Sequence, residues 1–259
     1  MLKRNARDEA GSAEGNEPSA PESTKSASPW LAFWNNPHTL YVNARHENAC
    51  SLGTARNIAA FVPFSDARVL DYGCGAALHA DLVAAAAGEL WLCEAAPRVR
   101  HALAARFAEC KNPKIYVIGP NEMECLPAHS FDLIVLNGVM QYLAPGDTDA
   151  LFVLFHGLLS STGTLIVGDV VPRDVGGLTD IADLLRLAVA NGFLFSAVLG
   201  LTRTFVSDYR RVRAQVGLTR YSEADIMAKL REARFIAHRA QQNTVEHHRR
   251  RMTFIAQPT

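Results

Sequence analysis

Residues 69–75, Val-Leu-Asp-Tyr-Gly-Cys-Gly, restrict the fold of this chain more than any other segment. They predict a strand over 68–71 that ends in a sharp turn, because Gly73 and Gly75 can adopt backbone conformations that other residues avoid. The alanine-rich segment 78–86 then predicts a helix. A strand, a glycine turn and a helix in this order are typical of a ligand-binding corner in a parallel sheet.

The same alternation continues along the chain. Short apolar runs that fit buried strands occur at 89–93, 114–118, 131–137 and 164–171. Helices are expected at 47–61, 97–110 and 148–159, with the polar run 160–163 breaking the last of these. A further helix is expected to start at Ser222, where Asp225 completes a capping box, and strands are expected at 235–238 and 252–256. This order predicts an α/β fold in which helices cover both faces of a mostly parallel sheet.

The composition is that of a globular protein with a substantial core. Of the 259 residues, 49% are hydrophobic and 20% are charged, so one large α/β domain over 29–259 is expected. Residues 1–28 are polar and small and are expected to form a disordered tail. The formal net charge of zero disfavours a nucleic-acid partner. The five cysteines show no metal-binding or disulfide pattern, which favours free thiols in the cytoplasm and no metal site.

The glycine turn is accompanied by two acidic residues. Asp71 ends the first strand, and Glu94 ends the next one, so both are expected at the same edge of the sheet. An acid such as Glu94 can accept hydrogen bonds from both hydroxyls of a ribose. The helix that follows the turn is expected to offer free N–H groups to an anion. These features predict a ligand with a ribose and an anionic group, although a turn whose glycines only pack helix against strand is the alternative.

Two cofactors have these features. A nicotinamide dinucleotide requires a third glycine at the position of Leu78, so its fingerprint is incomplete here. S-adenosylmethionine carries a carboxylate and positive charges, and Asp71 suits such a cationic cofactor better than a pyrophosphate. The residues therefore favour S-adenosylmethionine.

The chain resembles the class I S-adenosylmethionine-dependent methyltransferases over about 49–171 and again from 220 onwards. Besides the glycine turn, the segments that carry the resemblance are 121–127 (Asn-Glu-Met-Glu-Cys-Leu-Pro), 131–137 (Phe-Asp-Leu-Ile-Val-Leu-Asn), 158–165 and 219–223. One departure is Ala77, where the family often has a third glycine. The resemblance implies a Rossmann-like, doubly wound sheet of seven strands, with an antiparallel last strand and a helical insertion after the fifth.

The resemblance also implies a set of cofactor-binding residues. Glu122 is expected to accept a hydrogen bond from the adenine amino group, and the backbone of Met123 to bond a ring nitrogen. Residues from Gly138 to Tyr142 are expected to border the methyl group. The complete set is Tyr41, Asp71, Gly73, Cys74, Gly75, Glu94, Ala95, Glu122, Met123, Asn137 and Gly138.

Methyl transfer needs alignment more than a fixed catalytic group, so the catalytic residues are open. The candidates on the acceptor side are His46, His79 and Tyr142, together with Tyr41 and Gln141. Each has a plainer interpretation: a solvent-facing helix residue for His79, a packed loop aromatic for Tyr142, and N-terminal packing for Tyr41 and His46.

Residues 173–218 form the expected insertion. Its segment 187–202 has no charged residue, and it is too short and too interrupted by glycine for a membrane span. It predicts either a lid or an interfacial helix in peripheral contact with a membrane, although packing against the sheet would say nothing about the substrate. The basic run 247–251 predicts either an attractor of acidic groups or a solvated hairpin tip.

The leading hypothesis is therefore an S-adenosylmethionine-dependent methyltransferase that acts on a small-molecule or lipid-like acceptor. A non-catalytic subunit that binds the cofactor and supports a partner is the alternative. A nicotinamide-dependent oxidoreductase is disfavoured by Leu78, and RNA methylation is disfavoured by the neutral charge.

Overall fold

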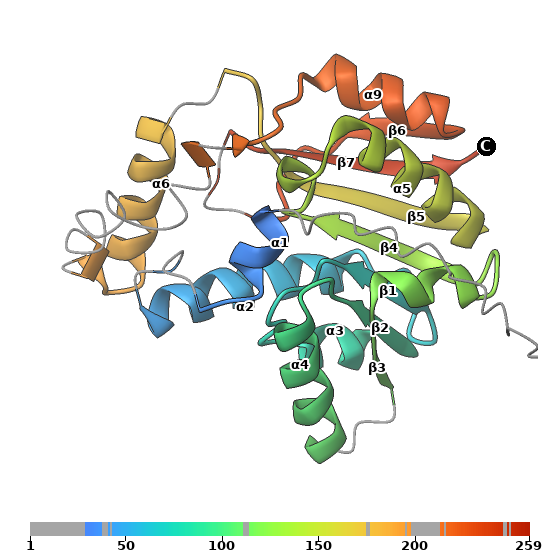
Figure 1. The fold of residues 1–259 in the computed structure, drawn as a ribbon, viewed down its shortest axis with the longest axis horizontal. Helices are drawn as coiled ribbons and strands as arrows, with labels where there is room; N and C mark the ends of the chain where they lie inside the picture. The colour runs from blue at the N-terminus through green and yellow to red at the C-terminus, as the bar shows by residue number, and fades with distance from the viewer. Residues whose placement is uncertain are drawn as a thin grey trace, which may run out of the picture.

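The computed structural model describes residues 29–37, 41, 43–110, 114–174, 177–194, 196–197, 213–214, 216–245, 248 and 250–259 (Figure 1). The predicted tail at 1–28 and much of the insertion beyond residue 197 lie outside the described residues.

Within the described residues, seven strands form one sheet in the order β3-β2-β1-β4-β5-β7-β6. Their bounds are Arg68–Tyr72 (β1), Glu89–Cys93 (β2), Ile115–Ile118 (β3), Phe131–Asn137 (β4), Leu159–Val170 (β5), Phe235–Arg239 (β6) and Met252–Pro258 (β7). Strands β1 to β5 pair in parallel, whereas β7 lies antiparallel between β5 and β6. The predicted fold class, a doubly wound sheet with an antiparallel last strand, is confirmed.

Helices connect these strands. The described α-helices are α1 (Pro29–Trp34), α2 (Ala44–Ala60), α3 (Ala80–Ala86), α4 (Pro97–Cys110), α5 (Pro145–Leu158), α6 (Gly177–Ala190) and α9 (Glu223–Glu232). Two 3-10 helices, η1 (Pro120–Cys125) and η2 (Met140–Tyr142), follow β3 and β4.

The sheet carries an apolar layer on each face. On one face, side chains of α2, α3 and α4 pack against alternate residues of the central strands, such as Val69 and Val135. On the other face, Phe152 and Phe155 of α5 and the apolar side of α9 cover Leu70 and its neighbours. Figure 1 shows α5 and α9 on one side of the sheet and α2 to α4 on the other. Burial on both faces explains why the central strands are almost continuously apolar.

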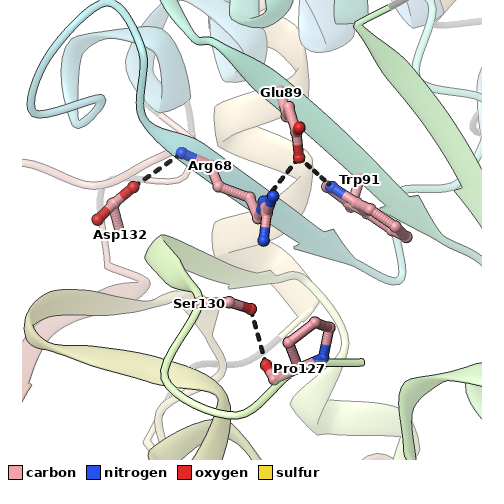
Figure 2. A network of polar contacts seen from close by, with 6 residues as sticks. All are labelled: Arg68, Glu89, Trp91, Pro127, Ser130 and Asp132. Atoms are coloured by element: carbon pink, nitrogen blue, oxygen red, sulfur yellow. Dashed lines mark hydrogen bonds and ion pairs between the residues drawn. The ribbon is translucent and has the colours of Figure 1, made fainter. Parts of the chain in front are cut away.

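A polar network joins three strands at the amino edge of the sheet, which is the edge opposite the glycine turn (Figure 2). Arg68 Nε lies 2.6 Å from Glu89 Oε2, which also accepts a hydrogen bond from Trp91 Nε1 at 3.1 Å. The Arg68 backbone N–H donates to Asp132 Oδ2 at 2.9 Å. The Arg68 guanidinium lowers the pKa of Glu89. These bonds link β2, β1 and β4 and fix their relative register.

The start of β5 differs from the sequence-based expectation. The polar run 160–163 belongs to β5 itself, and α5 already ends at Leu158. A register shift between Phe131 and Leu133 accommodates the longer strand. Gly163 is needed there, because a Cβ at this position would lie 2.8 Å from the backbone oxygen of Phe131. The break seen in the sequence is therefore a close approach of two strands.

Two helix starts illustrate local control of the fold. The capping box at Ser222 is confirmed: Ser222 Oγ accepts from the Asp225 N–H at 3.1 Å, and Asp225 Oδ2 accepts from the Ser222 N–H at 2.6 Å. The helix predicted over 78–86 begins later, at Ala80, because Ala77 has a left-handed φ of 39° that continues the turn.

The described part of the insertion is helical. Ala188 near the end of α6 forms a small apolar cluster with Phe193 and Ala197, while Val189 and Leu194 are exposed. No helix among the described residues is both long enough and apolar enough to cross a membrane.

Two neighbouring residues of α5 test the core. Phe152 is fully buried and Val153 is 63% exposed. We expect Phe152→Ala to lower the free energy of unfolding by about 3 to 5 kcal/mol, because it leaves a cavity in the core. Val153→Ala should change it by less than about 0.5 kcal/mol. Urea denaturation of both variants measures the difference, and similar losses would contradict the assigned face of α5.

Candidate functional site

The strand order changes direction between β1 and β4. From β1 the chain proceeds outward through β2 to β3, whereas β4 and β5 lie on the other side of β1. The connections after β1 and β4 therefore diverge at the carboxyl edge of the sheet, which is where open α/β sheets bind their ligands. The glycine turn lies at this position.

The two glycines of the turn have different roles. Both have left-handed backbones, with φ of 73° at Gly73 and 58° at Gly75. A Cβ at Gly73 would overlap the Val139 side chain, so this glycine lets the turn pack against the connection after β4. A Cβ at Gly75 would meet no atom within 4 Å, so this residue borders open space. Only Gly75 therefore faces a region that a ligand can fill.

The N–H groups of the turn are already used inside the protein. The N–H groups of Gly73 and Cys74 donate to the carbonyl oxygen of Cys93 at 2.8 and 3.3 Å, and that of Gly75 donates to Glu94 Oε2 at 2.9 Å. The free donors predicted from the sequence belong to the helix after the turn, so these three bonds leave that prediction untested. The N–H groups of Gly73, Cys74 and Gly75 attach the turn to the end of β2, and the backbone shape of the turn leaves space for a ligand beside Gly75.

Glu94 holds the carboxyl ends of β1 and β2 together. Its second oxygen, Oε1, accepts from the Ala96 N–H at 2.7 Å, and the residue is 8% exposed. Each carboxylate oxygen has a further lone pair for a ligand hydroxyl. Glu94 is therefore a preorganised acceptor, as the predicted role in binding a ribose requires.

Asp71 lies beside Glu94 and has an unusual environment. Burial and, to a smaller extent, the charge of Glu94 raise the pKa of its carboxyl to about 7. No side chain or backbone group of the described residues donates a hydrogen bond to it. A partly buried carboxylate without donors favours a positively charged ligand. This matches the preference for a cationic cofactor that the sequence indicated.

Two arginines of α4 support the turn, and the sequence analysis did not find them. Arg100 donates to the carbonyl oxygens of Glu94 and Ala95 at 2.6 and 3.2 Å. Arg106 donates to the carbonyl oxygens of Ala76 and Ala77 at 3.0 and 2.6 Å. Their spacing on α4 carries no motif, because the contact depends on how the helix lies against the turn.

The predicted adenine loop forms η1. Glu122 Oε2 accepts from the Gly119 N–H at 2.6 Å, so this carboxylate caps its own helix. Met123 is buried in the core, with 1% of its surface exposed. Contact of either residue with an adenine stays a prediction.

The residues after β4 are tied to one another. The Asn137 side chain accepts a hydrogen bond from Thr244 Oγ1 at 2.6 Å, so it joins β4 to the segment before β7. Gly138 has a φ of 68°, and its carbonyl oxygen accepts from Gln141 Nε2 at 2.8 Å. Gly138 and Gln141 therefore shape the edge of the site, whereas the Asn137 side chain is engaged elsewhere.

Tyr142 is held by an aromatic group from α1. Its ring centroid lies 4.7 Å from that of Trp30 and 5.3 Å from that of Trp34. Trp30 Nε1 donates to the carbonyl oxygen of Gly217 at 3.2 Å. Helix α1 thus connects the end of β4 with the insertion, and the packing role predicted as the alternative for Tyr142 is observed.

The three remaining candidates lie at the start of α2 and α3. Tyr41 and His46 are in edge contact, and His46 stacks on Phe193 from the insertion with a centroid distance of 5.3 Å. Burial lowers the pKa of His46 to about 4, with a smaller contribution from the charge of His248. His79 Nε2 lies 2.9 Å from Asn48 Oδ1, so this ring links the turn to α2.

The basic run before β7 is only partly described, since His247 and Arg249 lie outside the described residues. Arg251 is 9% exposed, and its Nη1 lies 3.6 Å from Asp169 Oδ2 at the end of β5. Neither predicted interpretation of this run fits Arg251, because it is a buried partner of an acid. The sequence analysis did not single out Asp169, because it lies inside the apolar run 164–171 that predicts a strand.

Comparisons with known proteins agree with this geometry. Residues 70–167 match the family model of a methyltransferase domain. No curated protein matches the chain.

Several solved structures share the fold. The magnesium protoporphyrin IX methyltransferase from Synechocystis PCC 6803, with S-adenosylhomocysteine bound, has a TM-score of 0.54 at 14% identity, and the match covers 89% of this chain and 93% of that one. The YcgJ protein from Bacillus subtilis has a TM-score of 0.52 at 16% identity and coverages of 73% and 70%.

A third structure is the N,N-8-amino-8-demethyl-D-riboflavin dimethyltransferase from Streptomyces davawensis. Its TM-score is 0.52 at 19% identity, and the match covers 79% of this chain. This chain spans only 53% of that protein's length. At these identities the likenesses show a common fold.

The carboxyl of Asp71 makes the stability of the ligand-free protein depend on pH. Its pKa rises from 3.8 to about 7 on folding, so between these values the folded state binds more protons than the unfolded state. The free energy of unfolding must therefore fall as the pH rises through this interval, and this contribution becomes constant above it. Asp71→Asn removes the contribution, so the variant should become progressively more stable than the wild type from about pH 4 to pH 7.

Urea denaturation at several pH values measures this difference. The contribution of His46 is common to both proteins and cancels. Parallel stability curves for the wild type and the variant would show that Asp71 titrates normally.

Proposed function

We propose that this chain is a class I S-adenosylmethionine-dependent methyltransferase and that it transfers a methyl group to a small-molecule or lipid-like acceptor. S-adenosylmethionine is its cofactor, and the glycine turn with its two acids is the observation that carries the proposal. The transfer is a direct displacement in which the cofactor, when bound, supplies the methyl group from a sulfonium.

The described residues fit this cofactor at three points. The open space beside Gly75 admits a ligand where a Cβ would project. Glu94 keeps lone pairs for two ribose hydroxyls while its hydrogen bonds to Gly75 and Ala96 fix its orientation. Asp71 supplies a negative charge to a cationic ligand. The nicotinamide alternative has less support, because the N–H groups of Gly73, Cys74 and Gly75 already bond within the protein and Leu78 replaces the third glycine of the dinucleotide fingerprint.

The role of the protein in the reaction is then alignment and exclusion of water. Gln141 holds the Gly138 carbonyl, and the Trp30–Tyr142 contact places α1 across the connection after β4. Groups fixed in this way hold the two reactants in line and do not reorganise during the reaction. Much of the acceleration of a displacement comes from this alignment.

A small or lipid-like acceptor is supported by the insertion. Phe193, which follows α6, stacks on His46 and brings apolar surface to the acceptor side of the site. Val189 and Leu194 of the segment 187–202 are exposed and suit contact with an apolar surface. We propose that this segment serves as a lid or as a peripheral membrane contact. The solved methyltransferases named above act on a porphyrin and on a flavin, which are both small molecules.

Gly75→Ala tests the cofactor site directly. Alanine at a left-handed position costs about 1 to 2 kcal/mol of stability, and its methyl group would occupy the open space beside the turn. We expect calorimetric titration with S-adenosylhomocysteine to show at least a tenfold loss of affinity in this variant.

Gly53→Ala is the matched control. Gly53 lies within α2, and a Cβ added there would meet no atom within 4 Å, so alanine should stabilise the helix and leave the affinity unchanged. Equal affinities of the Gly75→Ala variant and the wild type would remove the glycine turn from the binding site.

Turnover distinguishes an enzyme from a cofactor-binding subunit. We expect the purified protein to convert S-adenosylmethionine to S-adenosylhomocysteine only when an acceptor is added, with hydroxylated aromatic and lipid-like molecules as the first panel. Product formation is followed by mass spectrometry. Tight cofactor binding without turnover on any member of the panel would favour the non-catalytic alternative.

A further inference from the structure

Asp169 has a strained backbone at the carboxyl end of β5. Its φ is 53°, a left-handed value that is uncommon for residues other than glycine, and the residue is 9% exposed. Such conformations cost free energy and persist where the surrounding structure enforces them, often at functional sites. The position of Asp169 therefore requires an explanation beyond strand formation.

A bulge in β5 produces this conformation. Val167 pairs with Phe254 and Val170 pairs with Met252, and the register shifts between the two pairs. Val167 and Val170 face the same core cluster, although residues three apart in a regular strand face opposite sides of the sheet. The bulge therefore removes Asp169 from the alternation and redirects its side chain, as bulges beside active sites do.

Asp169 is the centre of a polar group that we name the Asp169 cluster: the buried Asp169, Arg251 and Gln141, and the partly buried Tyr41. Asp169 Oδ2 lies 3.6 Å from Arg251 Nη1, and a Cβ placed on Gly138 would lie 3.5 Å from Asp169 Oδ2 and 4.0 Å from Gln141 Nε2. The charge of Asp169 also contributes to raising the pKa of Tyr41, after the larger effects of burial, Cys50 and Glu47. The cluster thus collects side chains from four distant parts of the chain.

Gln141 points to a missing partner in this cluster. The residue is 6% exposed, and its Nε2 donates to the Gly138 carbonyl oxygen at 2.8 Å. Its Oε1 is buried, and none of the described residues donates a hydrogen bond to it. A buried acceptor without a donor costs free energy that a ligand N–H or O–H can recover.

The cluster lies on the opposite side of the site from Glu94. Gln141 and Asp169 lie at the carboxyl ends of β4 and β5, whereas Glu94 and the glycine turn follow β2 and β1. Strands β1 and β4 are neighbours in the sheet. A cofactor held over β1 and β2 therefore leaves the ends of β4 and β5 for the second reactant. His46 and Phe193 stack beside Tyr41 and form an aromatic wall there.

We propose that the Asp169 cluster binds the methyl acceptor, and that the acceptor presents a neutral hydroxyl or amine N–H to the Asp169 carboxylate and to Gln141 Oε1. The inference rests on the proposed function. Arg251 already balances the charge of Asp169, so the cluster selects a neutral donor over an anion.

The chemical step is balanced by this arrangement. The acceptor oxygen or nitrogen forms a bond to the methyl carbon as the carbon–sulfur bond breaks, and S-adenosylhomocysteine leaves with the electron pair of that bond. The proton of the acceptor passes to the Asp169 carboxylate, which holds it by hydrogen bonding before the transfer.

Binding of small probes to the full chain saturated with S-adenosylhomocysteine tests the proposal without turnover. Phenol and aniline carry a neutral donor, anisole has the ring without a donor, and benzoate is an anion. Ligand-observed NMR titrations should show binding of phenol or aniline, and weaker binding of anisole and benzoate. Stronger binding of benzoate than of phenol and aniline would overturn the proposal and assign the site to an anion held by Arg251. Binding of anisole as tight as that of phenol, or no binding of either phenol or aniline, would also overturn it.

Asp169→Asn is the decisive variant, because asparagine tolerates the left-handed backbone and has the same shape. We expect its affinity for the bound donor probe to fall about tenfold, with unchanged affinity for S-adenosylhomocysteine. Gln141→Met replaces the amide by an apolar side chain of similar length and so removes the acceptor Oε1. We expect this variant also to bind the donor probe more weakly, and it provides a second test if Asp169→Asn does not fold.

Asp132→Asn, at the other end of the sheet, is the control and should leave both affinities unchanged. Unchanged probe affinity in both cluster variants would refute the role of the cluster. Failure of the wild type to bind S-adenosylhomocysteine would instead refute the proposed function.

Discussion

The site depends on one carboxylate shared by two connections. Glu94 accepts the N–H of Gly75 from the turn after β1 and the N–H of Ala96 from its own connection. A charged group at 8% exposure is tolerated only where hydrogen bonds compensate its lost hydration, and these two N–H groups provide that compensation. Because β1 and β2 pair in parallel with Tyr72 opposite Cys93, the two connections leave the sheet side by side and the carboxylate reaches both. The turn, the acid and the space beside Gly75 therefore form a single unit.

Asp71 adds a charge that the ligand-free protein accommodates poorly. Its burial and the nearby Glu94 raise its pKa to about 7, so ionisation of this group opposes folding at neutral pH. A bound cation reverses the sign of this effect, because it favours the ionised carboxyl. Stability sacrificed in the ligand-free state is a common property of binding sites, and here it follows from two acids placed at the ends of adjacent strands.

The two sides of the site are built differently. The cofactor side consists of consecutive residues that follow β1 and β2, supported by Arg100 and Arg106 of α4. The acceptor side combines Tyr41, Gln141, Asp169 and Arg251, which come together only through the order β4-β5-β7 and the bulge at the end of β5. This difference explains why a short motif predicts the cofactor side, whereas no motif predicts the acceptor side.

The alternation of apolar strands and helices determined the fold class from the sequence alone, because it arises from the period of the side chains. The glycine turn and its two acids, which are close in the sequence, predicted the cofactor. The sequence also placed the capping box at Ser222, whose bonds span three positions. It did not reveal that the N–H groups of the turn are occupied, that the run 160–163 is a strand, or that Arg251 is buried against Asp169. Those properties belong to the tertiary structure, since each depends on a partner distant in the chain that only the packing of the sheet brings within reach.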